Sequence, residues 1–275
     1  MYKASKLRPI LSTDLRRLGQ ELDGGYVINQ RVIERTDILI TFGISGDWSF
    51  ESDFYKIKKG LPFKIEAYDF SVDFKQFIKT SFKQFLKIFE FKQGLTKFLF
   101  SLVYIKLAFK FTAFFNRKNI KFYKKGIDDH NHDVFIDFKT VFDNLGPLVR
   151  GEKVFIKMDI EGYEFKAVNQ MLDYADKLSG IIIEFHDLDK NGVVFDALLD
   201  LFREKSFVIT HVHPNNWGGV IEHTNLPRLL EITFARRSFF SETELSIPNN
   251  LTYPLSKLDF PCVKSIPELA MHFNE

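Results

Sequence analysis

Residues 37–71 constrain the fold more than any other stretch of this 275-residue chain. Residues 38–42, Ile-Leu-Ile-Thr-Phe, are rich in strand formers and too few for a helix, so they predict a buried strand. A glycine-containing turn follows, residues 50–59 predict a short helix, and residues 63–69 predict a second strand that ends in an acid. This order of elements is typical of a doubly wound α/β sheet.

The turn after the first strand predicts a binding site for a nucleoside. Glycine allows close approach of the backbone to a ligand, and the turn contains Gly43 and Gly46. Asp69 closes the second strand, where a carboxylate can accept hydrogen bonds from both ribose hydroxyls. Two glycines do not complete the G-x-G-x-x-G pattern of a pyrophosphate cradle, so a cofactor without phosphate, S-adenosylmethionine, fits better. The alternative is an ordinary turn.

The composition predicts one α/β domain, or one domain with a substantial insertion. The single cysteine, Cys262, excludes an internal disulfide framework and a cysteine-based metal cluster, and it suits a reducing cytoplasm. The first 19 residues lack the apolar region and the cleavage site of a secretory signal. We therefore expect a cytoplasmic protein.

Residues 72–121 predict an insertion with its own chemistry, between two parts, 1–71 and 122–275, of one sheet domain. Eleven Lys or Arg residues outnumber two acids there, and 12 of the 32 phenylalanines fall in the same stretch. Four lysines recur at every fourth residue and form a basic ridge on a helix: Lys75, Lys79, Lys83 and Lys87.

Residues 98–115 are apolar nearly all round and about long enough to span a membrane. Lys106 and Lys110 lie in their middle, and each is costly at the centre of a bilayer. We therefore expect a peripheral helical pair at the inner membrane, with lysines facing anionic lipid. A lid over the site and a contact between protomers of a homo-oligomer are the alternatives. A helix this apolar argues against nucleic acid as the partner.

Polar side chains follow several of the predicted strands, which we place at residues 120–123, 154–159, 180–187, 207–212 and 229–234. Because the carboxyl ends of parallel strands share one edge of a sheet, these side chains should converge there. An imidazole can take a proton from a hydroxyl near neutral pH, so His186 is the first candidate base and His213 the second. The other catalytic candidates at this edge are Asp159 and Glu184. A histidine that only satisfies a hydrogen bond in a loop is the alternative.

Two further interpretations concern the same edge. A hard divalent ion could be held by Asp159, Glu184, His186 and Asp187, but the spacing is not diagnostic and a metal is not favoured. Near the amino terminus, residues 23–28 predict a turn and a strand. There Arg16 or Arg17, with the backbone of Gly24 and Gly25, could contact the carboxylate of the cofactor, or the segment could be a hairpin that covers the sheet edge.

Three motifs carry a resemblance to a known family. VFIKMDIEGYEFKAV, residues 154–168, resembles the K-x-D-x-E-G-x-E signature of FkbM-type S-adenosylmethionine-dependent methyltransferases, and IIIEFH resembles the strand that follows it. DGGYV at 23–27 and TFGISGDWSFE at 41–51 resemble the amino-terminal half of that group. The resemblance spans residues 18–234 and leaves out the insertion and the tail. The usual D-x-G-A-N-x-G turn is replaced here by T-F-G-I-S-G-D.

The resemblance implies a Rossmann-like class I methyltransferase, with a mostly parallel seven-stranded sheet and helices on both faces. It implies S-adenosylmethionine as cofactor and O-methyl transfer to a sugar hydroxyl of a bacterial glycan, glycolipid or nucleotide-sugar precursor. The candidate cofactor-binding residues are Asp23, Gly24, Gly25, Tyr26, Gly43, Ile44, Ser45, Gly46, Glu51, Asp69, Phe70, Ser71, Ile127, Asp128 and Asp159. Another nucleotide-using α/β enzyme and a non-catalytic membrane-docking scaffold are the rival interpretations.

Overall fold

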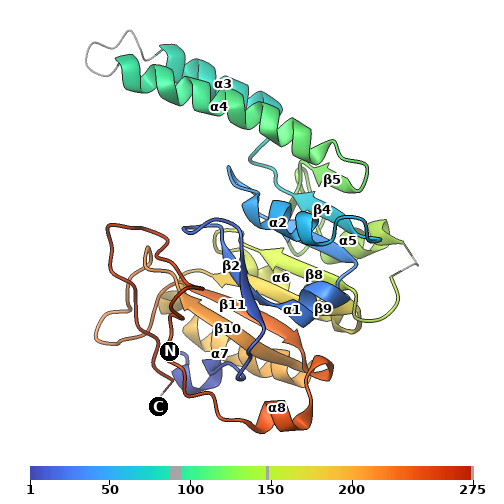
Figure 1. Cartoon of the computed structure of the whole chain (residues 1–275), viewed down its shortest axis with the longest axis vertical. Coiled ribbons are helices and arrows are strands. Elements are labelled where there is room, and N and C mark those ends of the chain that lie inside the picture. Colours follow the sequence, from blue (N-terminus) through green and yellow to red (C-terminus); the bar gives the residue numbers. More distant parts are fainter. Residues whose placement is uncertain (87–93, 147–148, 274–275) are drawn as a thin grey trace.

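The computed structural model describes residues 1–86, 94–146 and 149–273, and its centre is a seven-stranded sheet (Figure 1). The strand order is β10 (Phe207–Pro214), β11 (Leu230–Arg236), β9 (Leu178–Phe185), β8 (Val154–Met158), β3 (Ile38–Phe42), β4 (Lys64–Tyr68) and β5 (Ile120–Tyr123). β11 pairs antiparallel with both β9 and β10, and the other four pairs are parallel. The predicted fold class is therefore confirmed.

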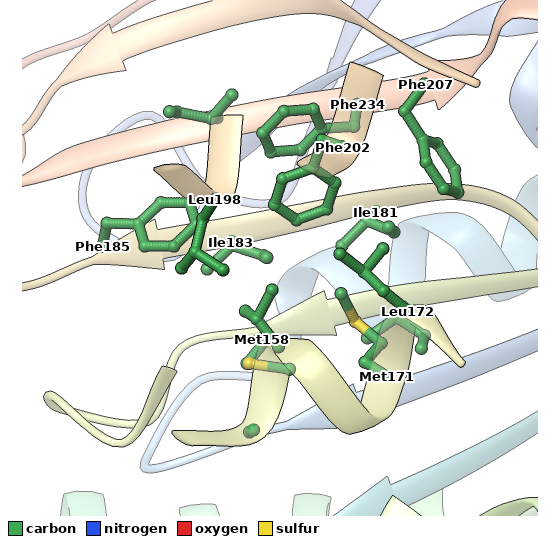
Figure 2. Close-up of a cluster of buried hydrophobic side chains, with 14 of the residues drawn as sticks. Met158, Met171, Leu172, Ile181, Ile183, Phe185, Leu198, Phe202, Phe207 and Phe234 are labelled. Carbon is green, nitrogen blue, oxygen red and sulfur yellow. The ribbon is translucent and has the colours of Figure 1, made fainter. Parts of the chain in front are cut away.

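Helices cover both faces of this sheet because its strands are apolar on both sides. Ile38, Ile40 and Phe42 join a core with α5 (Phe138–Leu145), α6 (Glu164–Leu172) and α7 (Leu188–Glu204). Leu39, between them in sequence, faces the other core with α1 (Gln30–Arg35) and α2 (Ser49–Ile57). Figure 2 shows part of the first core, in which the labelled side chains are Met158, Met171, Leu172, Ile181, Ile183, Phe185, Leu198, Phe202, Phe207 and Phe234.

Shorter elements complete the domain. β1 (Leu15–Leu18) and β2 (Tyr26–Asn29) form an antiparallel hairpin, and β6 (Gly126–Ile127) pairs in parallel with β7 (Phe135–Ile136). Single turns of helix occur at η1 (Ala4–Leu7), η3 (Ala175–Lys177), η4 (Arg237–Phe239) and α8 (Glu242–Ser246). The β1–β2 hairpin, one of the two alternatives for this segment, packs on the edge strand β10 and on its neighbour β11, where the Thr233 hydroxyl donates to the Val27 carbonyl.

The predicted insertion is a pair of helices, α3 (Phe74–Leu86) and α4 (Gly94–Phe115), that extends away from the sheet domain (Figure 1). The base of this helix pair packs on the domain. The ring centroid of Phe111 lies 5.7 Å from that of Trp48 and 4.9 Å from that of Phe122. Lys87, the last lysine of the predicted ridge, lies outside the described residues. Residues 120 and 121, which the predicted insertion also includes, belong to β5, so the strand predicted at residues 120–123 is confirmed.

Candidate active site

Two adjoining cavities open at the carboxyl ends of β3, β4, β8 and β9. The first, which we call the glycine-loop cleft, is about 480 Å³ in volume and is lined by the turn after β3 and by the ends of β4 and β8. The second, the acidic pocket, is about 640 Å³ and lies beyond the ends of β8, β9 and β10. Asp23, Asp159 and Glu161 line both cavities, so the two meet at these carboxylates.

Asp69 shapes the glycine-loop cleft rather than offering a free carboxylate. Its Oδ2 accepts from the backbone N–H groups of Ile44 and Ser45, both at 2.8 Å. Its Oδ1 accepts from the Ser71 N–H at 2.7 Å and the Ser71 hydroxyl at 2.6 Å. Asp69 lies in the cleft as predicted, but each oxygen already accepts two hydrogen bonds, which is its usual capacity.

Gly43 is fixed where the chain passes closest to the end of β8. Its φ is +78°, and a Cβ there would lie 1.7 Å from the Asp159 carbonyl oxygen. The buried Lys157 ammonium donates to the Gly43 carbonyl at 2.6 Å and lies 4.0 Å from the Asp159 carboxylate. Sequence reasoning did not assign Lys157, although a lysine inside the apolar run of β8 was a signal for it.

Aromatic side chains form the far end of the cleft. Phe70 lies 5.1 Å from Phe135, which in turn lies 6.1 Å from Tyr163 in a nearly parallel arrangement. Ile127 lines the same part of the cleft. This apolar slot suits a flat heteroaromatic ring. Sequence reasoning did not assign Phe135 or Tyr163, because a single aromatic residue carries no sequence signal for a binding site.

Asp128 and Glu51 do not line either cavity, although both were predicted to bind the cofactor. The Asp128 carboxylate accepts from the Asp129 N–H and lies 3.2 Å from the His132 ring. Glu51 is buried behind the cleft and accepts from the Thr41 hydroxyl at 2.6 Å. Burial raises the pKa of Glu51, and the nearby Lys157 opposes that rise in part.

The DGGYV motif contributes to the cleft in part. Asp23 and Gly24 line it, whereas Gly25 does not. A Cβ on Gly25 would lie 2.0 Å from the Gln20 carbonyl oxygen, so this glycine permits a tight loop. The Tyr26 hydroxyl donates to Asp159 Oδ2 at 3.2 Å and so supports a residue of the cleft from behind.

The predicted contact of Arg16 or Arg17 with the cofactor is not supported. The Arg17 guanidinium donates to the carbonyl groups of Gln20, Leu22 and Leu258 and holds the loop in place. The Arg16 guanidinium donates a hydrogen bond to the Gln30 side-chain oxygen at an exposed position. Neither arginine lines the cleft.

The acidic pocket gathers carboxylates from β8, β9 and the loops after them. Oxygen atoms of Asp159 and Glu184 and a ring nitrogen of His186 all lie within 4.8 Å of one another, as predicted for one rim. Glu184 is only 4% exposed and accepts from the Asn215 amide at 2.7 Å. Burial raises the pKa of Glu184 well above its usual value, and the charges of Asp159 and Glu231 raise it further.

His186 is oriented by a buried carboxylate. Its Nδ1 lies 3.0 Å from Glu164 Oε1, and its Nε2 lies 3.6 Å from Glu161 Oε2. Burial lowers the pKa of His186, but the hydrogen bond to Glu164 and the charges of Glu164, Asp159 and Glu161 outweigh it, so the pKa is raised. Because a carboxylate only accepts, Nδ1 carries the proton of the neutral ring and Nε2 is left as the basic atom.

His213 does not line either cavity, so the structure does not support it as a base. It is 1% exposed and lies between two carboxylates, with Nδ1 3.2 Å from Glu231 and Nε2 3.4 Å from Glu268. Its partners make it a structural ion pair. The sequence did not show this, because Glu268 comes from the proline-containing tail.

Three non-glycine residues at the cavities have left-handed backbone conformations: Ser45 (φ 48°), Glu161 (φ 55°) and Asp187 (φ 50°). Such conformations cost about 1–3 kcal/mol each and gather at functional sites. Ser45 lines the cleft, Asp187 lines the acidic pocket and Glu161 lines both. The other non-glycine residues with positive φ among the described residues, Asp133, Ser206, His223 and Lys257, line neither cavity, so the strain supports the site only in part.

Comparison with protein-family models gave no match, and comparison with curated protein sequences gave none either. Among solved structures, precorrin-6y C5,15-methyltransferase from Geobacter metallireducens has a TM-score of 0.33 and 12% identity, over 74% of this chain and 84% of that chain. M. jannaschii TYW2 in complex with AdoMet has a TM-score of 0.30 and 10% identity, over 82% and 89%. These scores are too low to carry an argument about the activity of this chain.

Proposed function

We propose that this chain is an S-adenosylmethionine-dependent O-methyltransferase of the FkbM type. The observation that carries the proposal is the junction of two cavities at Asp159, one with an apolar aromatic slot and a glycine loop, the other acidic and open to an acceptor. Ligands of doubly wound sheets bind at this end of the strands. The sequence resemblance names the cofactor that such a cleft would take.

The cleft offers complementary surroundings for each part of the cofactor. The adenine would lie against the apolar surface formed by Phe70, Phe135 and Ile127, while the glycine loop from Gly43 to Gly46 lies along the middle of the cleft. The sulfonium is a cation, and Asp23 and Asp159 at the junction would stabilise it. After transfer the product is a neutral thioether, so the same carboxylates favour binding of the substrate form.

The acceptor would enter through the acidic pocket. S-adenosylmethionine would supply the methyl carbon to the hydroxyl oxygen of the acceptor, and the electron pair of the broken carbon–sulfur bond would stay on sulfur. If the acidic pocket holds no metal ion, His186 Nε2 accepts the proton of that hydroxyl. Trp217, 71% exposed at the rim, offers an aromatic face to a sugar ring, and the carboxylates there favour a neutral sugar over a nucleotide sugar.

Isothermal titration of the full chain with S-adenosylhomocysteine tests the cofactor. We expect binding in the micromolar range or tighter, weakened at least tenfold by Phe135→Ala because the stacking surface is lost. Phe109→Ala, a matched change at an exposed residue of α4, should leave the affinity unchanged. Absence of binding would refute the proposal, and tight binding of NAD⁺ instead would favour another nucleotide-using enzyme. Binding without methyl transfer to any glycan would favour the scaffold interpretation.

We also propose that the α3–α4 hairpin docks on an anionic membrane surface, which would place the protein peripherally at the inner membrane. Residues 98–115 are long and apolar enough to cross a membrane, but only 28% of that window is buried. The side chains of Phe82 and Phe109 are 60% and 64% exposed. Other large apolar side chains of the two helices are exposed as well: Phe85, Phe98, Leu99, Phe100, Leu102 and Val103. The described residues of the two helices include lysines and no acids, so their charge complements anionic lipid.

Flotation with vesicles of phosphatidylcholine and phosphatidylglycerol tests the docking. Phe82→Ser with Phe100→Ser should abolish flotation, and Lys79→Gln with Lys83→Gln should weaken it and reduce its salt dependence. Val193→Ser, at an apolar residue of α7 that is 73% exposed, is the control. Flotation that survives the phenylalanine changes would refute membrane docking, and a dimer that they dissociate would assign the surface to self-association.

A further inference from the structure

The acidic pocket contains a buried carboxylate that lacks a counter-charge. Glu184 and Glu231 lie directly opposite each other on β9 and β11, and both are buried. Glu231 is compensated by His213, 3.2 Å away. Glu184 receives only the neutral amide of Asn215 among the described residues, and no described donor reaches its Oε2. A buried carboxylate in a protein is protonated, paired or bound to a metal, so Glu184 is available as a ligand for a cation.

The surroundings of Glu184 supply a ligand set with suitable geometry. Three residues of the acidic pocket each offer one ligand atom: Asp159, Glu184 and His186. These three atoms all lie within 4.8 Å of one another. Ligand atoms bound to one cation at about 2.0–2.6 Å lie no more than about 5 Å apart, so a single ion can contact all three.

The orientation of His186 is a second, independent observation that indicates a ligand. Metal-bound histidines usually donate their other ring N–H to a carboxylate. His186 Nδ1 lies 3.0 Å from Glu164, which is fully buried and also accepts from the Ile160 and Gly162 backbone N–H groups. This carboxylate does not line the pocket, and it leaves Nε2, which lies 3.6 Å from Glu161 Oε2, as the ring nitrogen that Glu164 does not engage.

We propose that Asp159, Glu184 and His186 hold a divalent cation, and the two carboxylates among these three ligands favour a hard ion such as Mn²⁺. Its catalytic role rests on the methyl transfer proposed above, whereas the binding site stands without it. A cation there contacts the acceptor hydroxyl and lowers the pKa of that hydroxyl, so its proton leaves to water and His186 serves as a ligand rather than as the base. The resulting alkoxide then forms the oxygen–carbon bond as the carbon–sulfur bond breaks.

Titration of the full chain with Mn²⁺, followed by electron paramagnetic resonance of free Mn²⁺, tests the site. We expect one ion to bind per chain and Glu184→Gln to weaken binding at least tenfold. Asp129→Asn is the matched control, because Asp128, Asp129 and His130 form another group of possible ligands, in which Asp129 is exposed. Circular dichroism of each variant verifies folding.

Two results would overturn the proposal: no stoichiometric Mn²⁺ binding to the wild type, or equal binding to the wild type and to a folded Glu184→Gln variant. Loss of binding in Asp129→Asn alone would place the ion elsewhere and would also overturn it. S-adenosylhomocysteine binding, measured on the same samples, separates the two proposals. Glu184 lies outside the glycine-loop cleft, so its change to glutamine should leave that affinity within about threefold.

Discussion

Replacing Gly43 with alanine should destabilise the protein far more than the same change at Gly46, three residues further along the same turn. A Cβ on Gly43 would lie 1.7 Å from the Asp159 carbonyl oxygen, and φ there is +78°. A Cβ on Gly46 would meet no protein atom within 4 Å, and its φ lies outside the left-handed range. The two glycines look alike in the sequence, so the pair isolates the tertiary contact.

The magnitude follows from two costs. A non-glycine residue in the left-handed region costs about 1–2 kcal/mol, and forcing a methyl group into packed surroundings costs about 1–3 kcal/mol, so Gly43→Ala should lose about 2–5 kcal/mol. The obstacle is backbone, which cannot rotate away as a side chain can. Gly46→Ala should change stability by less than about 1 kcal/mol, in the stabilising direction, because alanine restricts the unfolded chain.

Urea unfolding followed by circular dichroism measures both variants against the wild type. If Gly43→Ala does not fold at all while Gly46→Ala does, the expected difference in stability is also confirmed. Equal stabilities for the two variants would refute the reasoning, since the ends of β3 and β8 would then not approach as described.

Three further outcomes are expected. Asp69→Asn should cost about 1–3 kcal/mol, because an amide cannot accept from all the donors that the carboxylate satisfies, and urea unfolding would detect it; an unchanged unfolding midpoint would contradict this role. Phe54→Ala should cost about 3–5 kcal/mol because the ring is fully buried, and a loss below 1 kcal/mol would contradict its place in the core. Burial lowers the pKa of His213, but Glu231 and Glu268 raise it to about 10, so its stabilising contribution is complete below the unfolded pKa of about 6.5 and is lost as pH rises toward 10. Unfolding at pH 6, 8 and 9.5 should show this loss in the wild type and a smaller one in His213→Gln; parallel curves would exclude the effect.

The sequence predicted the order of the elements and the end of the sheet that carries the site. Apolar runs such as residues 38–42 and 154–158 form buried strands. Side chains on both faces of these strands are apolar, so both faces must pack against helices to be removed from water. The rule that parallel strands end on one rim then correctly brought Asp159, Glu184 and His186 together. These predictions depend on period, composition and chain direction, all of which are local properties of the sequence.

Only the tertiary structure decided what each rim residue can do. Asp69 lies where it was predicted, but four donors from nearby loops occupy its oxygens. His186 and His213 both follow strands, yet one faces a cavity and the other lies between two carboxylates, one from the tail. The role of a polar side chain depends on which distant donors and charges pack around it, and those neighbours are set by the packing of the whole chain.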